Sequence, residues 1–118
     1  DADILEAHHR NKVDAPSGTA LRIGEMIAAA QNSDFDERKR YPYVNRRKSG
    51  DIGFSVVRAG DIIGEHTVFF TADDERLEFT HRASNRRIFA RGALTAANWL
   101  GDRPAGLYSM ADVLGFTS

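Results

Sequence analysis

The residues best able to do chemistry stand close together near the start of the chain. Two adjacent histidines, His8 and His9, are followed by Lys12. Imidazole rings exchange protons near neutral pH, and a lysine ammonium is a compact positive charge for an anion. The stretch closes with Pro16 and residues 17–20, Ser-Gly-Thr-Ala, which are typical of a helix start. Together these residue types predict a site that binds a small carboxylate or phosphate and gives it a proton.

The predicted helix start adds neutral donors to these charges. The first backbone N–H groups of a helix are unpaired, and the positive end of its dipole favours an anion. Ser17 or Thr19 is expected to cap the helix, and Gly18 lets a ligand approach the backbone closely. Taken singly, Lys12 is more typical of a solvated loop and the serine of a plain cap, so the prediction rests on their combination.

Two other interpretations of these side chains remain open. A zinc site is one, because the chain has four histidines with two glutamates near two of them in sequence: His8, His9, His66, His81, Glu65 and Glu78. No pair has the spacing of a known zinc motif, so we expect no metal. Asp14 is a candidate catalytic acid, but its place before Pro16 favours a structural role in accepting backbone hydrogen bonds in a turn.

Length, charge and composition limit the classes of protein. A chain of 118 residues is at most one domain, so we expect residues 1–118 to form it. The net charge of −1 gives no general attraction to nucleic acid or to an anionic membrane, and the absence of cysteine excludes disulfides and thiolate metal sites. The apolar runs are too short to cross a bilayer and no signal peptide is visible, so we expect a cytoplasmic protein. The chain opens without a methionine, which indicates a domain of a longer protein.

A basic stretch follows the predicted helix. From Arg38 to Lys48 the chain has six basic residues and no acidic one, with Tyr41 and Tyr43 among them. Phosphate contacts and base stacking are one use for such a composition. The acidic residues just upstream and the balanced total charge favour a solvated or ligand-closing loop instead.

Apolar periodicity predicts the elements that position these residues. We expect a strand over 2–9, a helix over 18–31, a long polar loop over 32–51, a three-stranded meander over 52–58, 62–71 and 75–81, a helix over 86–100 and a helical turn over 109–114. Ser84 or Asn85 is expected to cap the later helix, Gly101 to end it, and Ser109 to cap the final turn. Gly24, inside the first helix, indicates close packing.

These elements predict an α+β fold, a four-stranded mixed sheet with helices on one face. The predicted strand over 62–71 carries Val68 and Phe70 on one side and Thr67 and Phe69 on the other. Because apolar side chains point to both sides, we expect the outer face of the sheet to be used for oligomer assembly.

The same residues carry a resemblance to a known family. Residues 6–20, E-A-H-H-x-x-K-x-D-A-P-S-G-T-A, closely resemble the signature of dihydrodipicolinate reductase (4-hydroxy-tetrahydrodipicolinate reductase). The resemblance continues in family order through Ile-Gly-Phe at 52–54, the run 58–66, Glu-Arg-Leu-Glu at 75–78, and segments 81–83 and 86–93. One departure lies before residue 52, where many relatives have a glycine-rich basic segment and this chain has a shorter one with a single glycine, Gly50.

The resemblance implies half of an enzyme. Family members join an N-terminal Rossmann domain, which binds NADH or NADPH, to a C-terminal domain that binds the substrate and builds a homotetramer. This chain is similar to the C-terminal domain and has no G-x-G-x-x-G fingerprint, so the Rossmann domain is absent from it and residues 103–118 are candidates to pack on that domain. The implied reaction reduces a cyclic dicarboxylate, 4-hydroxy-tetrahydrodipicolinate, to tetrahydrodipicolinate in lysine and diaminopimelate biosynthesis.

Residue roles follow from the resemblance position by position. His8 matches the residue that gives a proton to the substrate ring, and Lys12 matches a second candidate donor that also holds the substrate. His9 and residues 17–19 (Ser17, Gly18 and Thr19) match positions at the substrate carboxylates. Arg86 and Phe89 match positions near the cofactor. A stand-alone anion-binding or oligomerisation module without redox activity remains the alternative.

Overall fold

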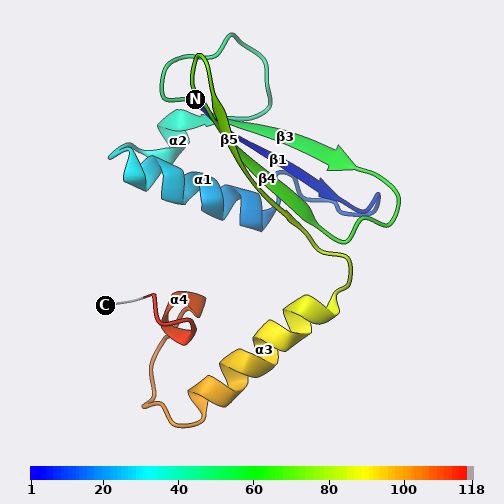
Figure 1. The fold of residues 1–118 in the computed structure, drawn as a ribbon, viewed down its shortest axis with the longest axis vertical. Helices are drawn as coiled ribbons and strands as arrows, with labels where there is room; N and C mark the ends of the chain where they lie inside the picture. Colours follow the sequence, from blue (N-terminus) through cyan, green and yellow to red (C-terminus); the bar gives the residue numbers. More distant parts are fainter. Residues whose placement is uncertain (117–118) are drawn as a thin grey trace. The chain divides into compact units, whose positions relative to one another are not determined.

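The computed structural model describes residues 1–116, in two compact units: Asp1–Ser84, here unit 1, and Asn85–Ser118, here unit 2. Residues 117 and 118, the end of the tail considered above, lie outside the described part. In chain order the elements are β1 (Ala2–His8), α1 (Gly18–Ala30), α2 (Phe35–Arg38), β2 (Lys39–Arg40), β3 (Ile52–Arg58), β4 (Glu65–Thr71), β5 (Arg76–Arg82), α3 (Arg87–Leu100) and α4 (Met110–Val113) (Figure 1).

Unit 1 is built on one mixed sheet with the strand order β2-β3-β1-β4-β5. The central strand β1 runs parallel to β3 and antiparallel to β4. Parallel neighbours need a crossover connection, and α1 with the segment after it supplies one between β1 and β3. The α+β class and the mixed sheet are confirmed.

Two details of the predicted sheet are wrong. The sheet has five strands instead of four, because Lys39–Arg40 in the predicted loop forms β2 beside β3, just after the short helix α2. The three later strands do not form a meander, because β1 lies between β3 and β4, and only β4 and β5 are a hairpin. Strand order depends on pairing between distant residues, which local periodicity does not reveal.

The core lies between α1 and one face of the sheet (Figure 1). Side chains alternate along a strand, so the even-numbered residues of β1 face α1, and Ile4 is fully buried there. The strand register puts Phe54 and Val68 on either side of Ile4, and both are in the core. The helix contributes small residues, with Ala20 and Ala28 buried against them.

Gly24 is a buried residue of α1 that packs against two aromatic rings. A Cβ added there would lie 2.7 Å from the rings of both Phe35 and Phe54. The close packing expected at this glycine is therefore confirmed, and Phe35 of α2 reaches it from a segment predicted to be loop.

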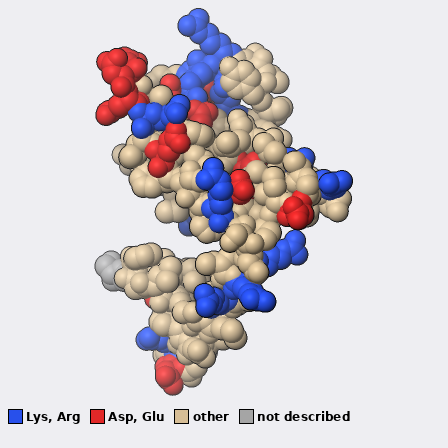
Figure 2. Space-filling model, turned by 45° about the vertical axis from the view of Figure 1, so that its right-hand side comes forward, with Lys and Arg blue, Asp and Glu red and all other residues tan. Residues whose placement is uncertain are grey.

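The basic stretch is held to the sheet by its own arginines. Arg47 donates to Asp3 at 2.6 Å and to two backbone carbonyls at 2.7 and 2.8 Å. Arg38 donates to the carbonyl of Ser49 at 3.1 Å, and Arg40 lies 3.6 Å from the centre of the Tyr43 ring. On the face shown in Figure 2, Lys and Arg alternate with Asp and Glu over unit 1.

Unit 2 holds α3 and α4. The predicted bounds of α3 are nearly met, but its N-cap is Arg86, and Asn85 contributes by accepting from the backbone N–H of Arg87 at 2.9 Å. Ser109 caps α4 in a capping box with Asp112, as expected. No residue of α3 is buried. Within the described residues, no helix is long and apolar enough to cross a membrane.

Candidate functional site

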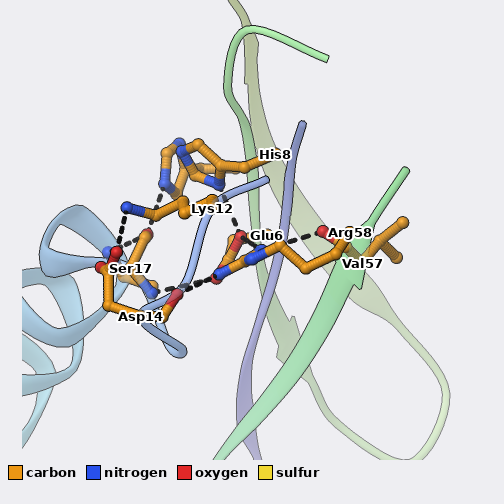
Figure 3. Close-up of polar contacts among 9 residues, drawn as sticks. Glu6, His8, Lys12, Asp14, Ser17, Val57 and Arg58 are labelled. Carbon is orange, nitrogen blue, oxygen red and sulfur yellow. Dashed lines mark hydrogen bonds and ion pairs between the residues drawn. The ribbon is translucent and has the colours of Figure 1, made fainter. Parts of the chain in front are cut away.

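Several strand ends and one helix end meet at a single edge of the sheet. Since β1 and β3 are parallel, His8 and its register partner Arg58 both lie at their carboxyl ends. The antiparallel strand β4 brings His66 opposite Glu6 at the same edge. The chain leaves β1 there and begins α1 after Ser17. Residues far apart in sequence are thus placed within reach of each other (Figure 3).

Glu6 is the centre of this cluster, and its side chain is fully buried. Its Oε1 accepts from the backbone N–H of Ser17 at 2.9 Å and from Nη2 of Arg58 at 2.8 Å. Its Oε2 accepts from Nη1 of Arg58 at 2.7 Å and pairs with Nδ1 of His8 at 2.7 Å. The dashed lines of Figure 3 show Glu6 between the arginine and the histidine. Each carboxylate oxygen therefore receives two donors.

The surroundings keep Glu6 ionised. Burial raises the pKa of this carboxyl, but the hydrogen bonds from Arg58, His8 and Ser17 together outweigh burial, so the pKa lies below its usual 4.5. The same pairing with Glu6 raises the pKa of the Arg58 guanidinium. A buried ion pair whose oxygens are all hydrogen-bonded is a rigid unit at neutral pH.

His8 and His66 lie edge to face, with their ring centroids 5.2 Å apart. His66 Nε2 lies 3.0 Å from the hydroxyl of Ser17. Burial, followed by the electrostatic interaction with His8, lowers the pKa of His66 below its usual 6.5. Lys12 also lowers it, so the lysine belongs to the same electrostatic cluster.

The start of α1 offers free donors. Ser17 caps the helix, its hydroxyl accepting from the backbone N–H of Ala20 at 3.2 Å, and it is buried. Its own N–H is used by Glu6, so Ser17 is committed within the protein. Gly18 and Thr19 are exposed, and within the described residues their backbone N–H groups have no hydrogen bond. These two groups are available to an anion at the positive end of the helix dipole.

Lys12 lies in the loop that joins β1 to α1, just before these donors in sequence. Its Nζ lies 2.8 Å from Oδ1 of Asp14, and its side chain is 21% exposed. The hydrogen bond from Lys12 lowers the pKa of the Asp14 carboxyl. Asp14 is largely exposed, and exposed ion pairs are weak, so an incoming anion can take its place. The carbonyl of Asp14 accepts from Arg58 at 2.7 Å, which holds the loop against the sheet.

The chain matches one family along nearly its whole length. The sequence profile described as "Dihydrodipicolinate reductase, C-terminus" matches residues 1–114. This chain belongs to the dihydrodipicolinate reductase family. The resemblance first seen in residues 6–20 is thereby confirmed.

Relatives in the family are similar over almost all of this chain. The 4-hydroxy-tetrahydrodipicolinate reductase of Gluconobacter oxydans is 54% identical over 114 residues, which cover 97% of this chain and 46% of that protein. The reductase of the same name from Pseudoalteromonas translucida is 57% identical over 117 residues, 97% of this chain and 44% of that protein. The chain thus spans slightly under half the length of these relatives.

A solved structure shares the fold. Dipicolinate-bound dihydrodipicolinate reductase from Paenisporosarcina sp. TG-14 matches with a TM-score of 0.71 and 25% sequence identity. The match covers 95% of this chain and 44% of that one.

His9, Arg86 and Phe89 are the remaining candidates from the resemblance. His9 is half-buried just beyond the end of β1, and among the described residues its ring has no hydrogen-bond partner. Arg86 and Phe89 belong to unit 2, where Phe89 is 56% exposed. The structure describes no group of three metal-ligating side chains in residues 1–116. The roles of these residues remain predictions.

Sequence reasoning missed Glu6 and Arg58. Glu6 was part of the family signature but was given no role. An acidic residue two positions before His8 on a strand points to the same face of the sheet as the histidine. That spacing was the available signal. Arg58 had none, because it is 52 residues away from Glu6.

Proposed function

We propose that this chain is the substrate-binding half of an NAD(P)H-dependent 4-hydroxy-tetrahydrodipicolinate reductase, which produces tetrahydrodipicolinate in lysine and diaminopimelate biosynthesis. The observation that carries the proposal is the meeting of an oriented imidazole, a lysine and a free helix start at one sheet edge. Family membership supplies the reaction, and the geometry supplies groups suited to it.

The substrate has two carboxylates on one ring, which need separate groups of donors. Lys12 gives a charged donor from the loop after β1, and the backbone N–H groups of Gly18 and Thr19 give neutral donors at the start of α1. His9 is proposed as a further donor. A solved relative is described as dipicolinate-bound, and dipicolinate (pyridine-2,6-dicarboxylate) is a planar dicarboxylate of this kind.

The 4-hydroxy substrate must lose its hydroxyl as water to give a conjugated imine, and reduction of that imine adds a hydride to one ring carbon and a proton to its neighbour. A general acid for this protonation needs a pKa near neutrality, which is the range of an imidazole. We assign proton donation to His8, with Lys12 as the second candidate donor. The ring of His8 is mostly buried and its Nδ1 is bound to Glu6, so Nε2 is the nitrogen left for the substrate.

The described residues do not fit a dinucleotide site. The connection from β1 to α1, residues 9–17, has no glycine, whereas a dinucleotide pyrophosphate needs a glycine-rich strand-to-helix turn. NADH or NADPH is therefore proposed to bind on a Rossmann domain outside this chain. Arg86 and Phe89 are proposed to approach it, since they have an exposed cation and an exposed ring to offer.

Two surfaces are proposed to contact other parts of the enzyme. Residues 103–118 are proposed to pack on the Rossmann domain, because Leu107, Leu114 and Phe116 are 101%, 55% and 80% exposed. The sheet face away from α1 is proposed to assemble a cytoplasmic homotetramer, because Leu5 and Val57 on that face are 36% and 41% exposed.

The test is a calorimetric titration of the intact protein, with its nicotinamide cofactor, with pyridine-2,6-dicarboxylate. Lys12→Ala is expected to weaken binding by about 10- to 100-fold, because it removes a charge-assisted hydrogen bond. Asn11→Ala is the matched control, since Asn11 is an exposed neighbour whose side chain makes no hydrogen bond to a described residue, and it is expected to bind normally.

Two results count against the proposal. Equal binding by wild type and Lys12→Ala removes the lysine from the site. Absence of binding by the wild type with cofactor present contradicts the substrate class itself.

A further inference from the structure

The buried carboxylate of Glu6 has all of its hydrogen-bonding capacity used within the protein. Four hydrogen bonds converge on it, two on each oxygen, and the side chain is inaccessible to solvent. A carboxylate in this state has no free lone pair and no path to a ligand. Glu6 therefore acts only through the residues that it holds.

One of those residues is His8, and it is held on two sides. Its Nδ1 is 2.7 Å from Glu6, and on the opposite side of the ring Nε2 faces Gly64. A Cβ added at Gly64 would lie 3.2 Å from this Nε2, so the glycine leaves the space that the ring occupies. Among the described residues, Nε2 has no hydrogen-bond partner.

We propose that Glu6, braced by Arg58, is a positioning residue that fixes His8 so that Nε2 delivers the proton to the substrate. This inference rests on the proposed function, in which His8 is the proton donor. The carboxylate keeps the proton on Nδ1 and sets the plane of the ring. Arg58 holds the carboxylate through both of its oxygens, and the N–H of Ser17 ties it to the start of α1.

The proton step then balances within the ring. The Nε2–H bond breaks as a C–H bond forms with the electron pair on the substrate carbon, and the electrons of the N–H bond stay on Nε2. The imidazole becomes neutral and keeps the proton on Nδ1, which stays hydrogen-bonded to Glu6. A new proton is then taken up at Nε2 from the solvent. Glu6 and Arg58 stay ionised throughout.

The decisive variant is Glu6→Gln in the intact protein, assayed for kcat and for binding of pyridine-2,6-dicarboxylate. We expect kcat to fall by about 100-fold, the usual effect of a displaced reacting group, with the dissociation constant of the dicarboxylate nearly unchanged. A merely structural defect would weaken binding of the dicarboxylate together with kcat, whereas a misplaced ring lowers kcat and leaves binding intact.

Glu65→Gln is the matched control. Glu65 is also a glutamate at this edge of the sheet, but it pairs with Arg82 at 3.5 Å, and its register position puts it on the face away from α1. Its variant is expected to keep the wild-type kcat.

Removing the charge of Glu6 leaves the half-buried Arg58 without its carboxylate partner, and this is destabilising. If Glu6→Gln does not fold, Gly64→Ala tests the same ring from the other side. The added methyl group forces Nε2 to move by a few tenths of an ångström, so kcat is expected to fall while the dicarboxylate still binds.

The outcomes separate this inference from the proposed function. Normal kcat in Glu6→Gln, or normal kcat in Gly64→Ala, overturns the positioning role if His8→Ala is inactive. Normal kcat in His8→Ala overturns the proposed function, and the inference with it.

Discussion

The two histidines of the site are held by opposite kinds of contact. His8 meets an ionised carboxylate at 2.7 Å, whereas His66 meets a neutral hydroxyl at 3.0 Å. The lowered pKa of His66 leaves it uncharged at neutral pH. Of two rings only 5.2 Å apart, His8 is the one that contacts an ionised carboxylate.

The lowered pKa of His66 makes stability depend on pH. Below pH 6.5 the unfolded chain protonates this histidine while the folded protein resists, so the free energy of unfolding falls as the pH drops through this window. His66→Gln is expected to reduce the fall in melting temperature of the intact protein between pH 7.5 and pH 5.5, because glutamine has no proton to gain.

His9→Gln is the control for this measurement, since His9 has no side-chain hydrogen bond to a described residue. An unchanged pH dependence in His66→Gln would contradict the assignment. Glu6 acts in a separate window, because its pKa is lowered from 4.5 and its contribution is lost only at more acidic pH.

At the residue scale, the sequence indicated the candidate ligand-binding groups but not the groups that lie behind them. His8, Lys12 and the helix start belong to one short segment, so their types and spacing were visible together. The side chains behind these groups include Arg58, which contacts Glu6, and His66, which contacts Ser17. Both lie on other strands and are brought to the segment only by the pairing of the sheet. No local pattern indicates such pairs.

At the element scale, bounds were more predictable than partners. The strand Ile52–Arg58 and the cap at Ser109 lie where turn residues and apolar alternation indicate. The central place of β1 was not predictable, because it depends on the crossover through α1 and on pairing with β4. That placement nevertheless brings His8, Arg58 and His66 to one edge.

The contact between α1 and the sheet gives a test at this scale. Gly24→Ala gains up to about 1 kcal/mol of helix propensity, but its methyl group meets two aromatic rings, and overpacking of this kind costs roughly 1–3 kcal/mol. We expect net destabilisation, seen as a lower melting temperature of the intact protein. Glu25→Ala, at an exposed position of the same helix, is the control and should change little. A higher melting temperature of Gly24→Ala would contradict this prediction, because it would mean that the rings of Phe35 and Phe54 move aside at little cost in free energy.

At the scale of the whole molecule, the chain corresponds to a part of its relatives. It spans 44–46% of the relatives' length, and no residue of α3 is buried within it. The sheet edge places donors for an anion and a proton, while the described residues offer no turn for a dinucleotide. These two observations support the proposed division of labour, in which the nicotinamide cofactor binds outside this chain.

The most direct test of this account is the turnover of 4-hydroxy-tetrahydrodipicolinate by the intact protein, followed as oxidation of NADH or NADPH. The wild type is expected to be active, and His8→Ala to lose on the order of 100- to 10,000-fold in kcat, the usual contribution of a general acid. Asn11→Ala should retain wild-type turnover. Near-normal kcat in His8→Ala, or no substrate-dependent oxidation by the wild type, would contradict the central claim that this edge of the sheet binds and protonates the dicarboxylate.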